Sequence, residues 1–246
     1  MKLTPLVLAL ALASPAAAFD ISAMSDAERE AFRAEIRSYL LENPEVLAEA
    51  IDVLQERQAA EAAKGDLQLV KANTDDLYND GYSFVGGNPD GDITVVEFID
   101  YRCSYCRKAH AEVKQLIESD GDIRYVVKEF PILGEQSLIA SRFAIAALQT
   151  LGPDAYEKIN AGFYESFRGD VTRETLASFA DSLGLDGGAI IAQMDSPEVT
   201  RVIEQNHELA QRMQISGTPT FVMGGQMLRG YVPLDMMQAI VAEERG

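Results

Sequence analysis

Residues 92–110 read DITVVEFIDYRCSYCRKAH and contain both cysteines of the chain, Cys103 and Cys106. Residues 92–101 form a short, β-branched and nearly continuous apolar run, which is typical of a strand buried on both faces. From Cys103 onward the apolar residues recur at helical spacing, and Gly121 marks the end of the predicted helix. Cys103 is therefore expected in the first helical turn, directly after a strand.

Three kinds of site place two cysteines at this spacing. A structural disulfide between them would stabilise the fold little, because it would close a very short loop. A zinc site would need His110 and His207, the only 2 histidines. Structural zinc sites usually combine two short-spaced pairs of ligands, whereas His207 stands alone in a helical stretch. The third kind is a redox pair.

The position of the pair favours redox chemistry. Unpaired N–H groups and the helix dipole stabilise a thiolate at a helix N-terminus, and Arg102, Arg107 and Lys108 add positive charge nearby. A cysteine so placed has a lowered pKa and attacks disulfides, while its partner three residues later resolves the intermediate. We expect no cofactor and no resident metal. The alternative is a module that binds Cu(I) or Zn through the two thiolates.

The surrounding patterns alternate between strand and helix. A second strand is predicted within residues 122–133, followed by helices over about 135–215, with Ser137, Thr172 and Ser196 at helix starts. SGTPTFVMGGQMLRG (216–230) predicts a hairpin that turns at its two adjacent glycines. The last helix, in PLDMMQAIVAEE, is expected to bury Met236 together with Ile240 and Val241.

The order of these motifs resembles the thioredoxin fold in its DsbA-like form. The motifs are VVEFIDYRCSYC (95–106), VVKEFPIL (126–133) and SGTPTFVMGG (216–225), and the resemblance covers residues 83–246. It implies an α/β thioredoxin domain over residues 79–246 with a helical domain inserted at about 135–215.

The resemblance also implies roles for single residues. Cys103 matches the nucleophile of the family and Cys106 the resolving cysteine. Pro219 matches the cis-proline, whose loop offers the Thr218 backbone to an extended substrate. Glu97 matches a buried acid that relays protons near the pair, with an outward-facing strand glutamate as the alternative.

The direction of electron flow is suggested by two further matches. Tyr105 and Thr218 resemble the disulfide-isomerase branch more than the oxidase branch, although Ser104 departs from the Pro or Gly usual in both. We therefore expect a thiol-disulfide exchange protein that is an isomerase or reductase rather than a pure oxidase, with a monomeric dithiol oxidase as the alternative.

The N-terminus has the pattern of an export signal. Lys2 precedes the apolar run from Leu6 to Ala13, and small residues follow up to Ala18. A run of this length is too short to span a bilayer, which needs about 20 residues. We expect a signal peptide at residues 1–18, export to the periplasm, and cysteine-containing exported proteins as substrates. A membrane redox partner would reset the pair.

Residues 19–78 form a predicted helical segment ahead of the domain. Ser25 and Glu28 fit a capping box, and Asn43 with Pro44 marks a second helix start. Both helices are amphipathic, with the stripe Phe32, Ile36, Leu40, Leu47, Ile51 and Leu54. Residues 79–92 are expected to be a linker and a turn. ScsC-like members of the family often use such extensions to oligomerise, so the resemblance implies a homo-oligomer.

Overall charge limits the partners. The chain has a net charge of -18 at pH 7. Such an acidic chain repels nucleic acid and anionic membrane surfaces, so nucleic acid is not expected as a partner.

Overall fold

The computed structural model describes residues 21–246. The predicted signal peptide, residues 1–18, lies outside the described residues. The chain divides into two compact units between Gln58 and Ala59. Among residues 21–246, no helix combines the length and apolar character that a membrane span requires.

The described part of the first unit, residues 21–58, is helical. A 3-10 turn, η1 (Ile21–Ala23), precedes α1 (Asp26–Glu42), and α2 (Glu45–Ala72) begins in this unit and continues into the second. The Ser25 side chain accepts from the Glu28 backbone while the Glu28 carboxylate accepts from Ser25, which confirms the predicted capping box. α1 contains no buried residue. In the described part of this unit, Leu40 of the predicted stripe is half-buried. Most large apolar side chains there are exposed in the single chain: Phe32, Ile36, Tyr39, Leu41, Leu47, Ile51, Val53 and Leu54.

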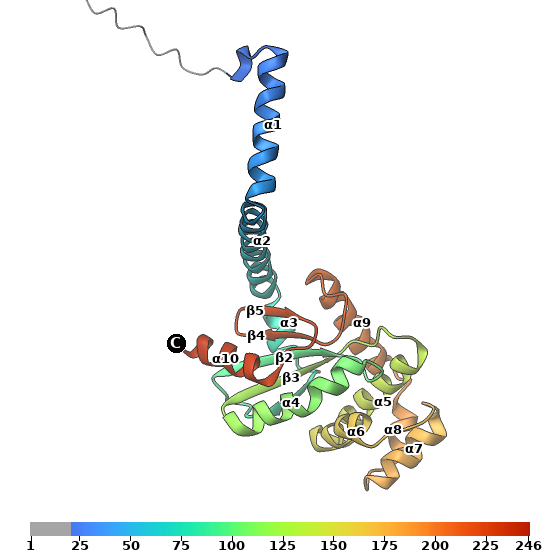
Figure 1. The fold of residues 1–246 in the computed structure, drawn as a ribbon. Helices are drawn as coiled ribbons and strands as arrows, with labels where there is room; N and C mark the ends of the chain where they lie inside the picture. The colour runs from blue at the N-terminus through green and yellow to red at the C-terminus, as the bar shows by residue number, and fades with distance from the viewer. Residues whose placement is uncertain (1–20) are drawn as a thin grey trace, which may run out of the picture. The chain divides into compact units, whose positions relative to one another are not determined.

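A five-stranded sheet forms the centre of the second unit, in the order β1-β3-β2-β4-β5 (Figure 1). β2 and β3 are parallel and the other pairs are antiparallel. The strands are β1 (Phe84–Gly87), β2 (Ile93–Ile99), β3 (Ile123–Glu129), β4 (Thr220–Met223) and β5 (Gln226–Arg229). The β4–β5 hairpin confirms the turn predicted at Gly224 and Gly225.

β1 corrects the prediction that residues 79–92 are only a linker and turn. It pairs with β3 at the sheet edge, and only Phe84 is buried along it, so the sequence shows no alternating pattern. Gly87 has a φ of 66°, and a side chain there would meet the Ile123 carbonyl at 2.4 Å. The glycines that suggested a loop thus permit close packing of an edge strand.

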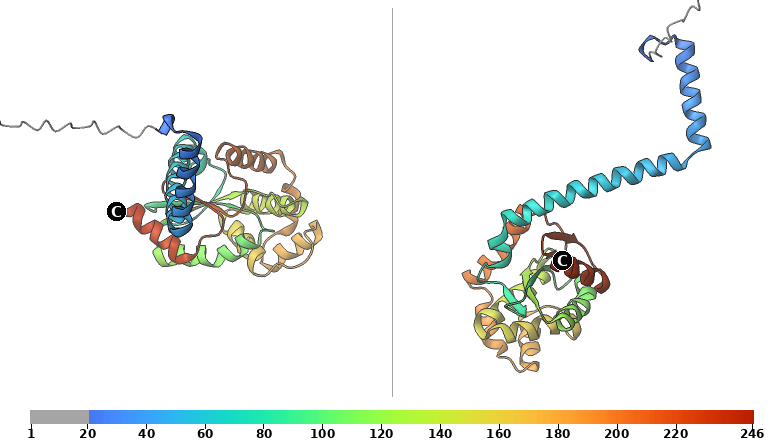
Figure 2. Two further views of the ribbon diagram at one scale, coloured as in Figure 1. Left: turned by 45° about the horizontal axis from the view of Figure 1, so that its top comes forward. Right: turned by 90° about the vertical axis from the view of Figure 1, so that its left-hand side faces the viewer.

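Helices cover both faces of the sheet (Figure 2). α4 (Ser104–Asp120) and α10 (Leu234–Arg245) pack on one face, in a core that includes Ile93 and Val95 of β2. The end of α2, α3 (Thr74–Tyr78) and α9 (Pro197–Arg212) cover the other face, where Val96 and Phe98 lie. The alternation along β2 therefore directs Glu97 toward the face that α4 covers.

The insertion comprises α5 (Glu135–Leu151), α6 (Pro153–Glu165), α7 (Arg173–Ser182), α8 (Gly187–Gln193) and α9. Its apolar side chains form one cluster with Ile99, Tyr101 and Val127, and α5 to α8 lie together beyond one end of the sheet (Figure 1). The caps at Thr172 and Ser196 are confirmed. Ser137 does not begin α5, because the helix starts at Glu135 after Gly134.

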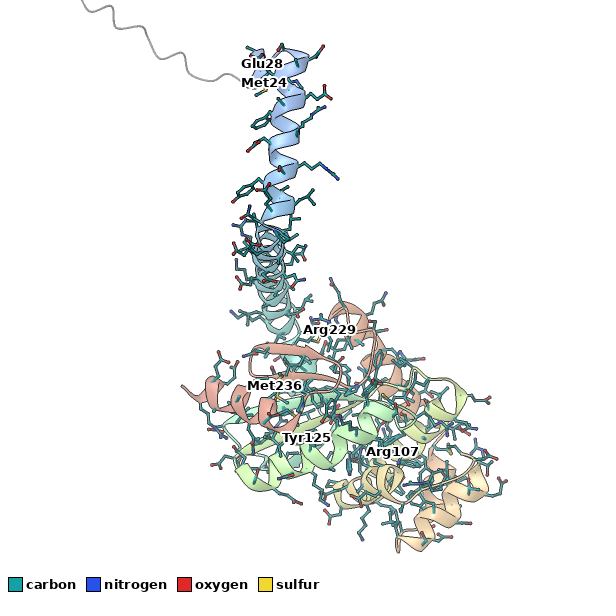
Figure 3. The ribbon with its side chains drawn as sticks, in the orientation of Figure 1. Met24, Glu28, Arg107, Tyr125, Arg229 and Met236 are labelled. Carbon is teal, nitrogen blue, oxygen red and sulfur yellow. The ribbon has the colours of Figure 1, made fainter. Side chains whose placement is uncertain are left out.

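α10 differs from the prediction by one residue. Met236 is 53% exposed, and Met237 is fully buried with Ile240 and Val241 (Figure 3). Residues 237, 240 and 241 share a face at i, i+3 and i+4 spacing. The buried face of α10 therefore contains Met237 in place of Met236, which the sequence predicts.

The last part of α2 packs within the second unit. Val70 and Leu77 are buried in the core on the α9 side of the sheet. Arg229 of β5 donates to both carboxylate oxygens of Asp66 at 2.6 and 2.8 Å. The second unit therefore starts before residue 79, which is the domain boundary that the sequence predicts.

Candidate active site

The two cysteines lie at the junction of β2 and α4, as the sequence indicates. Cys103 is the N-cap residue of α4, with φ -75° and ψ 119°, one position before the first helical residue. Cys106 is in the first turn. Both are free thiols, and Cys103 is 8% exposed whereas Cys106 is 1% exposed. Only Cys103 thus retains some contact with solvent.

The two thiols differ strongly in acidity. Hydrogen bonding from the Cys106 thiol lowers the pKa of Cys103 to about 5, helped by the Thr218 side chain and by the backbone N–H groups of Cys106 and Tyr105. The same hydrogen bond raises the pKa of Cys106, and burial and the charge of Glu97 act in the same direction. At neutral pH, Cys103 is the thiolate and Cys106 holds its proton.

The loop before β4 faces Cys103. The peptide bond between Thr218 and Pro219 is cis, as the resemblance implies. The Cys103 Sγ lies 3.2 Å from the Thr218 carbonyl oxygen, which accepts a hydrogen bond from Cys103 when the thiol is protonated. Thr218 is partly exposed and Pro219 is buried. The backbone of a partly exposed residue next to the sulfur is a position from which an extended peptide can be held.

Glu97 lies beneath the pair and is buried, so its outward-facing alternative is excluded. Its side chain is on the face of β2 toward α4, and the residue is 3% exposed. Burial raises the pKa of Glu97 to about 7, with a hydrogen bond from Tyr125 lowering it and the charge of Cys103 raising it. A carboxyl group with this pKa can accept or release a proton near neutral pH.

Tyr125 of β3 is a site residue that the sequence did not indicate. Its hydroxyl donates to the Glu97 carboxylate from the neighbouring parallel strand. Tyr125, labelled in Figure 3, also lines a cleft of about 630 Å³ together with residues of β1, α4 and α6. A tyrosine 28 residues away gives no local signal, although pairing β2 with β3 would have placed it near Glu97.

Other predicted residues lie apart from the thiols. The Tyr105 side chain is 60% exposed, and only its backbone N–H acts on Cys103. His110 stacks on Tyr164, and His207 stacks on Phe130. Within residues 21–246, the structure brings no three His, Cys, Asp or Glu side chains into a metal-binding group, so the four proposed zinc ligands do not converge.

Comparison with known proteins places this geometry in a family. The thioredoxin family profile matches residues 79–243. The chain belongs to the thioredoxin family. A second profile, the N-terminal domain of the copper resistance protein ScsC, matches residues 28–61.

Two solved structures resemble this thioredoxin-family chain along most of their lengths. A thioredoxin-like oxidoreductase from Silicibacter pomeroyi DSS-3 is 40% identical, with a TM-score of 0.65, over 70% of this chain and 96% of that chain. ScsC of Proteus mirabilis, in a transitional conformation, is 27% identical with a TM-score of 0.65, over 92% of this chain and 98% of that one. The α/β thioredoxin fold with a helical insertion and N-terminal helices is confirmed.

Curated relatives differ in length from this chain. The thiol:disulfide interchange protein DsbA of Bordetella parapertussis is 26% identical over 142 residues, which are 56% of this chain and 66% of that protein. The Na(+)/H(+) antiporter NhaA of Herminiimonas arsenicoxydans is 30% identical over 162 residues, and this chain spans 25% of its length. This chain thus spans only part of the length of these curated relatives.

A second buried carboxylate lies beyond the pair. Glu129, at the end of β3, accepts hydrogen bonds from the hydroxyls of Tyr101, Tyr156 and Ser141 at 2.6, 2.6 and 2.7 Å. Burial raises the pKa of Glu129 to about 7, although these hydrogen bonds lower it. Because Tyr101 precedes the active-site turn and Tyr156 belongs to α6, Glu129 links that turn to the inserted helices.

Proposed function

We propose that this protein catalyses thiol-disulfide exchange, with Cys103 as the attacking thiolate and Cys106 as the resolving thiol. The observation that carries the proposal is the division of acidity within the pair. The pKa of Cys103 is lowered to about 5 at the N-terminus of α4, while Cys106 is buried and keeps its proton. Attack on the substrate requires an accessible thiolate. Resolution requires a second thiol that loses its proton only after the mixed disulfide has formed.

The exchange proceeds in two steps. The Cys103 thiolate attacks one sulfur of a substrate disulfide, so a Cys103–substrate bond forms, the substrate S–S bond breaks, and one substrate thiolate leaves. The Thr218 backbone holds the substrate segment meanwhile. Glu97 then takes the proton of Cys106, whose thiolate attacks the Cys103 sulfur and releases the second substrate thiolate. The substrate is reduced by two electrons and the pair becomes a disulfide, and the reverse sequence oxidises a dithiol.

The substrates we propose are cysteine-containing exported proteins in the periplasm. Support comes from the export signal expected at residues 1–18 and from the similarity to DsbA, which is named for thiol:disulfide interchange. Disulfides persist in such a compartment. A membrane redox partner that resets the pair completes the cycle.

We further propose isomerase or reductase activity in a homo-oligomer assembled through residues 19–78. The match of residues 28–61 to the ScsC N-terminal domain supports a distinct role for this segment. The exposed apolar side chains of α1 and early α2 supply a surface that a second copy can bury. Several active sites in one assembly could hold a substrate while its disulfides rearrange.

Trapping of intermediates tests the exchange directly. The Cys106→Ala variant lacks the resolving thiol, so incubation with a disulfide-containing protein should accumulate a mixed disulfide through Cys103. The Cys103→Ala variant should form none. Non-reducing electrophoresis with peptide mapping measures both. Equal trapping by the two variants, or trapping through Cys106, would contradict the assigned roles.

A further inference from the structure

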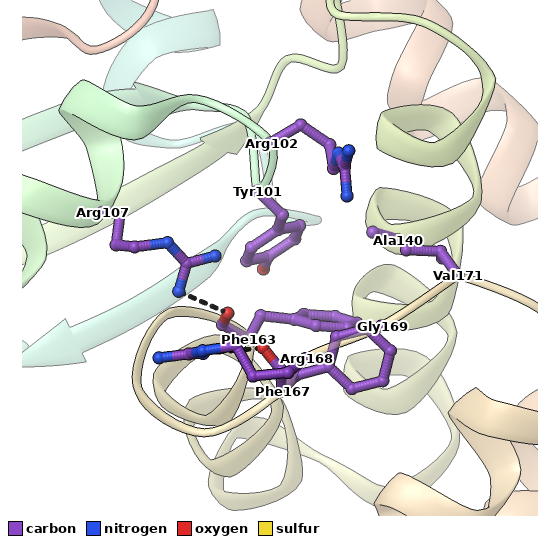
Figure 4. A pocket seen from close by; sticks show the side chains of 9 residues that line it. All are labelled: Tyr101, Arg102, Arg107, Ala140, Phe163, Phe167, Arg168, Gly169 and Val171. Carbon is purple, nitrogen blue, oxygen red and sulfur yellow. Dashed lines mark hydrogen bonds between the residues drawn. The ribbon is translucent and has the colours of Figure 1, made fainter.

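Three arginines surround a pocket beside the active-site turn. Arg102 and Arg107 approach it from opposite sides of Tyr101, and Arg168 lies across from them (Figure 4). The pocket has a volume of about 130 Å³, and its apolar wall includes Phe163, Phe167 and Val171. All three arginines are exposed, so the pocket opens to solvent.

The positive charge of this pocket is not neutralised by the chain. Arg107 donates to the carbonyl oxygens of Phe163 and Tyr164, and Arg168 to those of Phe167 and Glu165. No ion pair found in residues 21–246 includes Arg102, Arg107 or Arg168. The nearby Glu165 carboxylate lies instead 3.5 Å from His110 and 4.0 Å from Lys114.

The arginines also act on one another. The pKa of Arg107 is lowered by partial burial, and then by the positive charges of Arg168 and Arg102. Three like charges are therefore held close together in a chain that has 39 Asp and Glu residues and a net charge of -18. An anion in the pocket would relieve this repulsion.

The Cys103 thiolate does not account for the cluster. Its pKa is lowered chiefly by the Cys106 thiol, the Thr218 side chain and backbone N–H groups, not by the arginines that the sequence suggested. Lys108, the remaining basic residue of the turn, lies 3.8 Å from the ring centre of Tyr231. Arg102, Arg107 and Arg168 are therefore available for a group from outside the chain.

The dimensions of the pocket indicate which chemical group it can bind. Pockets for whole small molecules usually measure about 300–1,000 Å³. This one is smaller, at about 130 Å³, and suits a carboxylate with its methylene groups against the apolar wall. Arg102 is adjacent to Cys103 in the chain, and an extended peptide advances about 3.3 Å per residue. A residue a few positions from the substrate cysteine can therefore reach the arginines.

We propose that this pocket binds an acidic side chain of the substrate polypeptide, close in sequence to the cysteine that Cys103 attacks. The proposal rests on the proposed exchange function and adds a substrate preference to it. Guanidinium groups bind carboxylates through paired hydrogen bonds, which gives both orientation and affinity. At physiological ionic strength the Debye length is about 8 Å, so the arginines outweigh the distant negative charge of the protein.

Peptide disulfides of matched sequence test the preference. Each peptide has one cysteine and carries Glu, Gln or Lys at one position, two to four residues to either side, and is used as its symmetric disulfide. Stopped-flow reduction by the reduced full-length protein gives the exchange rates. At the best position the Glu peptide should react about fivefold faster than the Gln peptide, the upper range for an exposed ion pair, and the Lys peptide more slowly than Gln. Added salt should reduce the difference.

Variants connect this preference to the pocket. In the double variant Arg102→Gln with Arg168→Gln, the ratio of Glu to Gln rates should fall to about one. Arg107 is left in place because it binds the last carbonyls of α6. The charge reversal Arg168→Glu should favour the Lys peptide. Arg201→Gln removes an exposed arginine of α9 outside the pocket and should keep the native ratio.

The outcomes separate the two proposals. Equal rates for all three peptides in the native protein would overturn the pocket proposal and leave exchange intact. A preference for Glu that survives in the double variant, or that Arg201→Gln also abolishes, would likewise overturn it. Absence of exchange with every peptide would contradict the proposed function itself, and the substrate preference with it.

Discussion

At the scale of single residues, we propose that four groups from two strands and one helix control the thiol chemistry. Cys103 and Cys106 share a hydrogen bond that separates their pKa values, and Glu97 lies close enough to raise that of Cys106. Tyr125 lowers the pKa of Glu97 against the larger effect of burial. In the proposed mechanism, Glu97 accepts the proton of Cys106, and a hydrogen bond from the neighbouring strand adjusts the pKa of Glu97.

Removing the Tyr125 hydroxyl should shift the pH dependence of resolution. In the native protein, release of substrate should accelerate as Glu97 loses its proton, at a pH of about 7. The Tyr125→Phe variant loses the hydrogen bond that lowers this pKa, so the rise should move to higher pH. Rapid-quench measurement of mixed-disulfide decay from pH 5 to 9 gives the profile.

Tyr105→Phe provides a matched control. It removes a tyrosine hydroxyl from a residue between the cysteines, but Tyr105 is exposed whereas Glu97 is buried. Its profile should coincide with the native one. An unchanged profile in Tyr125→Phe, or an equal shift in Tyr105→Phe, would show that Tyr125 does not set the acidity of Glu97.

Sequence reasoning located the residues of this site that belong to local motifs. Cys103, Cys106, Glu97 and Pro219 follow from a strand-to-helix junction and from the resemblance. Tyr125 could not be found in this way, because its role depends on the register between β2 and β3. The sequence places Arg102 and Arg107 beside the cysteines, but the pocket also needs Arg168, which follows α6 and carries no local signal.

At the scale of elements, Glu129 connects β3 with the inserted helices. Its donors belong to the turn after β2, to α5 and to α6. Asn160 of α6 also donates to the Tyr101 hydroxyl, at 3.2 Å. This buried polar network fixes the position of the inserted helices beside the active-site turn. Apolar contacts alone would let those helices shift relative to the turn.

The network should make stability depend on pH. The pKa of Glu129 in the folded state is about 7, above its ordinary value of 4.5. The folded state thus favours the protonated form of Glu129, so the contribution of this group to stability is full below pH 4.5 and is lost as the pH rises through 7. Glu129→Gln should remove up to about 3 kcal/mol of this decline. Urea unfolding at a series of pH values measures it.

The Glu129→Gln variant should keep the pH dependence of stability that Glu97 contributes, because burial raises the pKa of Glu97 as well. Glu204→Gln, on the exposed surface of α9, should leave the pH dependence of the native protein unchanged. A Glu129→Gln variant whose stability declines as steeply as that of the native protein would contradict a protonated Glu129 in the folded state.

Most elements were predictable because their apolar spacing and caps are local. Ser196 and Thr172 start helices for the reason the sequence suggests, which is hydrogen bonding of their side chains to free backbone N–H groups. β1 was not predictable, since an edge strand with one buried residue lacks the alternating pattern. The start of α5 at Glu135 was not predictable either. Ser137, the expected start, is buried inside the helix instead of capping it.

At the scale of the whole molecule, the described part of the first unit exposes apolar side chains, which we propose a second copy covers. Ile36, Leu47, Ile51 and Leu54 are between 44% and 54% exposed in the single chain. Amphipathic helices are stabilised mainly by burying such a face. Assembly of several copies through these helices would bury it and bring several active sites together.

Light scattering on the mature chain should therefore report a multiple of the monomer mass. A shortened chain should begin at Ala59 rather than at residue 79, because Val70 and Leu77 belong to the core of the second unit. We expect this chain to be a monomer that exchanges disulfides but loses isomerase activity on scrambled substrates. A monomeric mature chain would favour a simple oxidase or reductase.

Substitutions within the helices refine this test. Leu47→Gln with Ile51→Gln should weaken assembly, since both side chains leave the apolar stripe. Glu49→Gln changes an exposed polar residue of the same helix and should not. If both variants assemble equally well, the stripe is not the contact surface.

The central claim, that Cys103 is the thiolate of the pair, is tested most directly by alkylation as a function of pH. The reduced protein is pulsed with iodoacetamide between pH 3 and 10, and the modified peptide is identified by mass spectrometry. Cys103 should be modified first, with a midpoint at a pKa of about 5, and Cys106 should remain unmodified across this range. A midpoint for Cys103 near the ordinary thiol value of about 8.5, or faster modification of Cys106, would contradict the account.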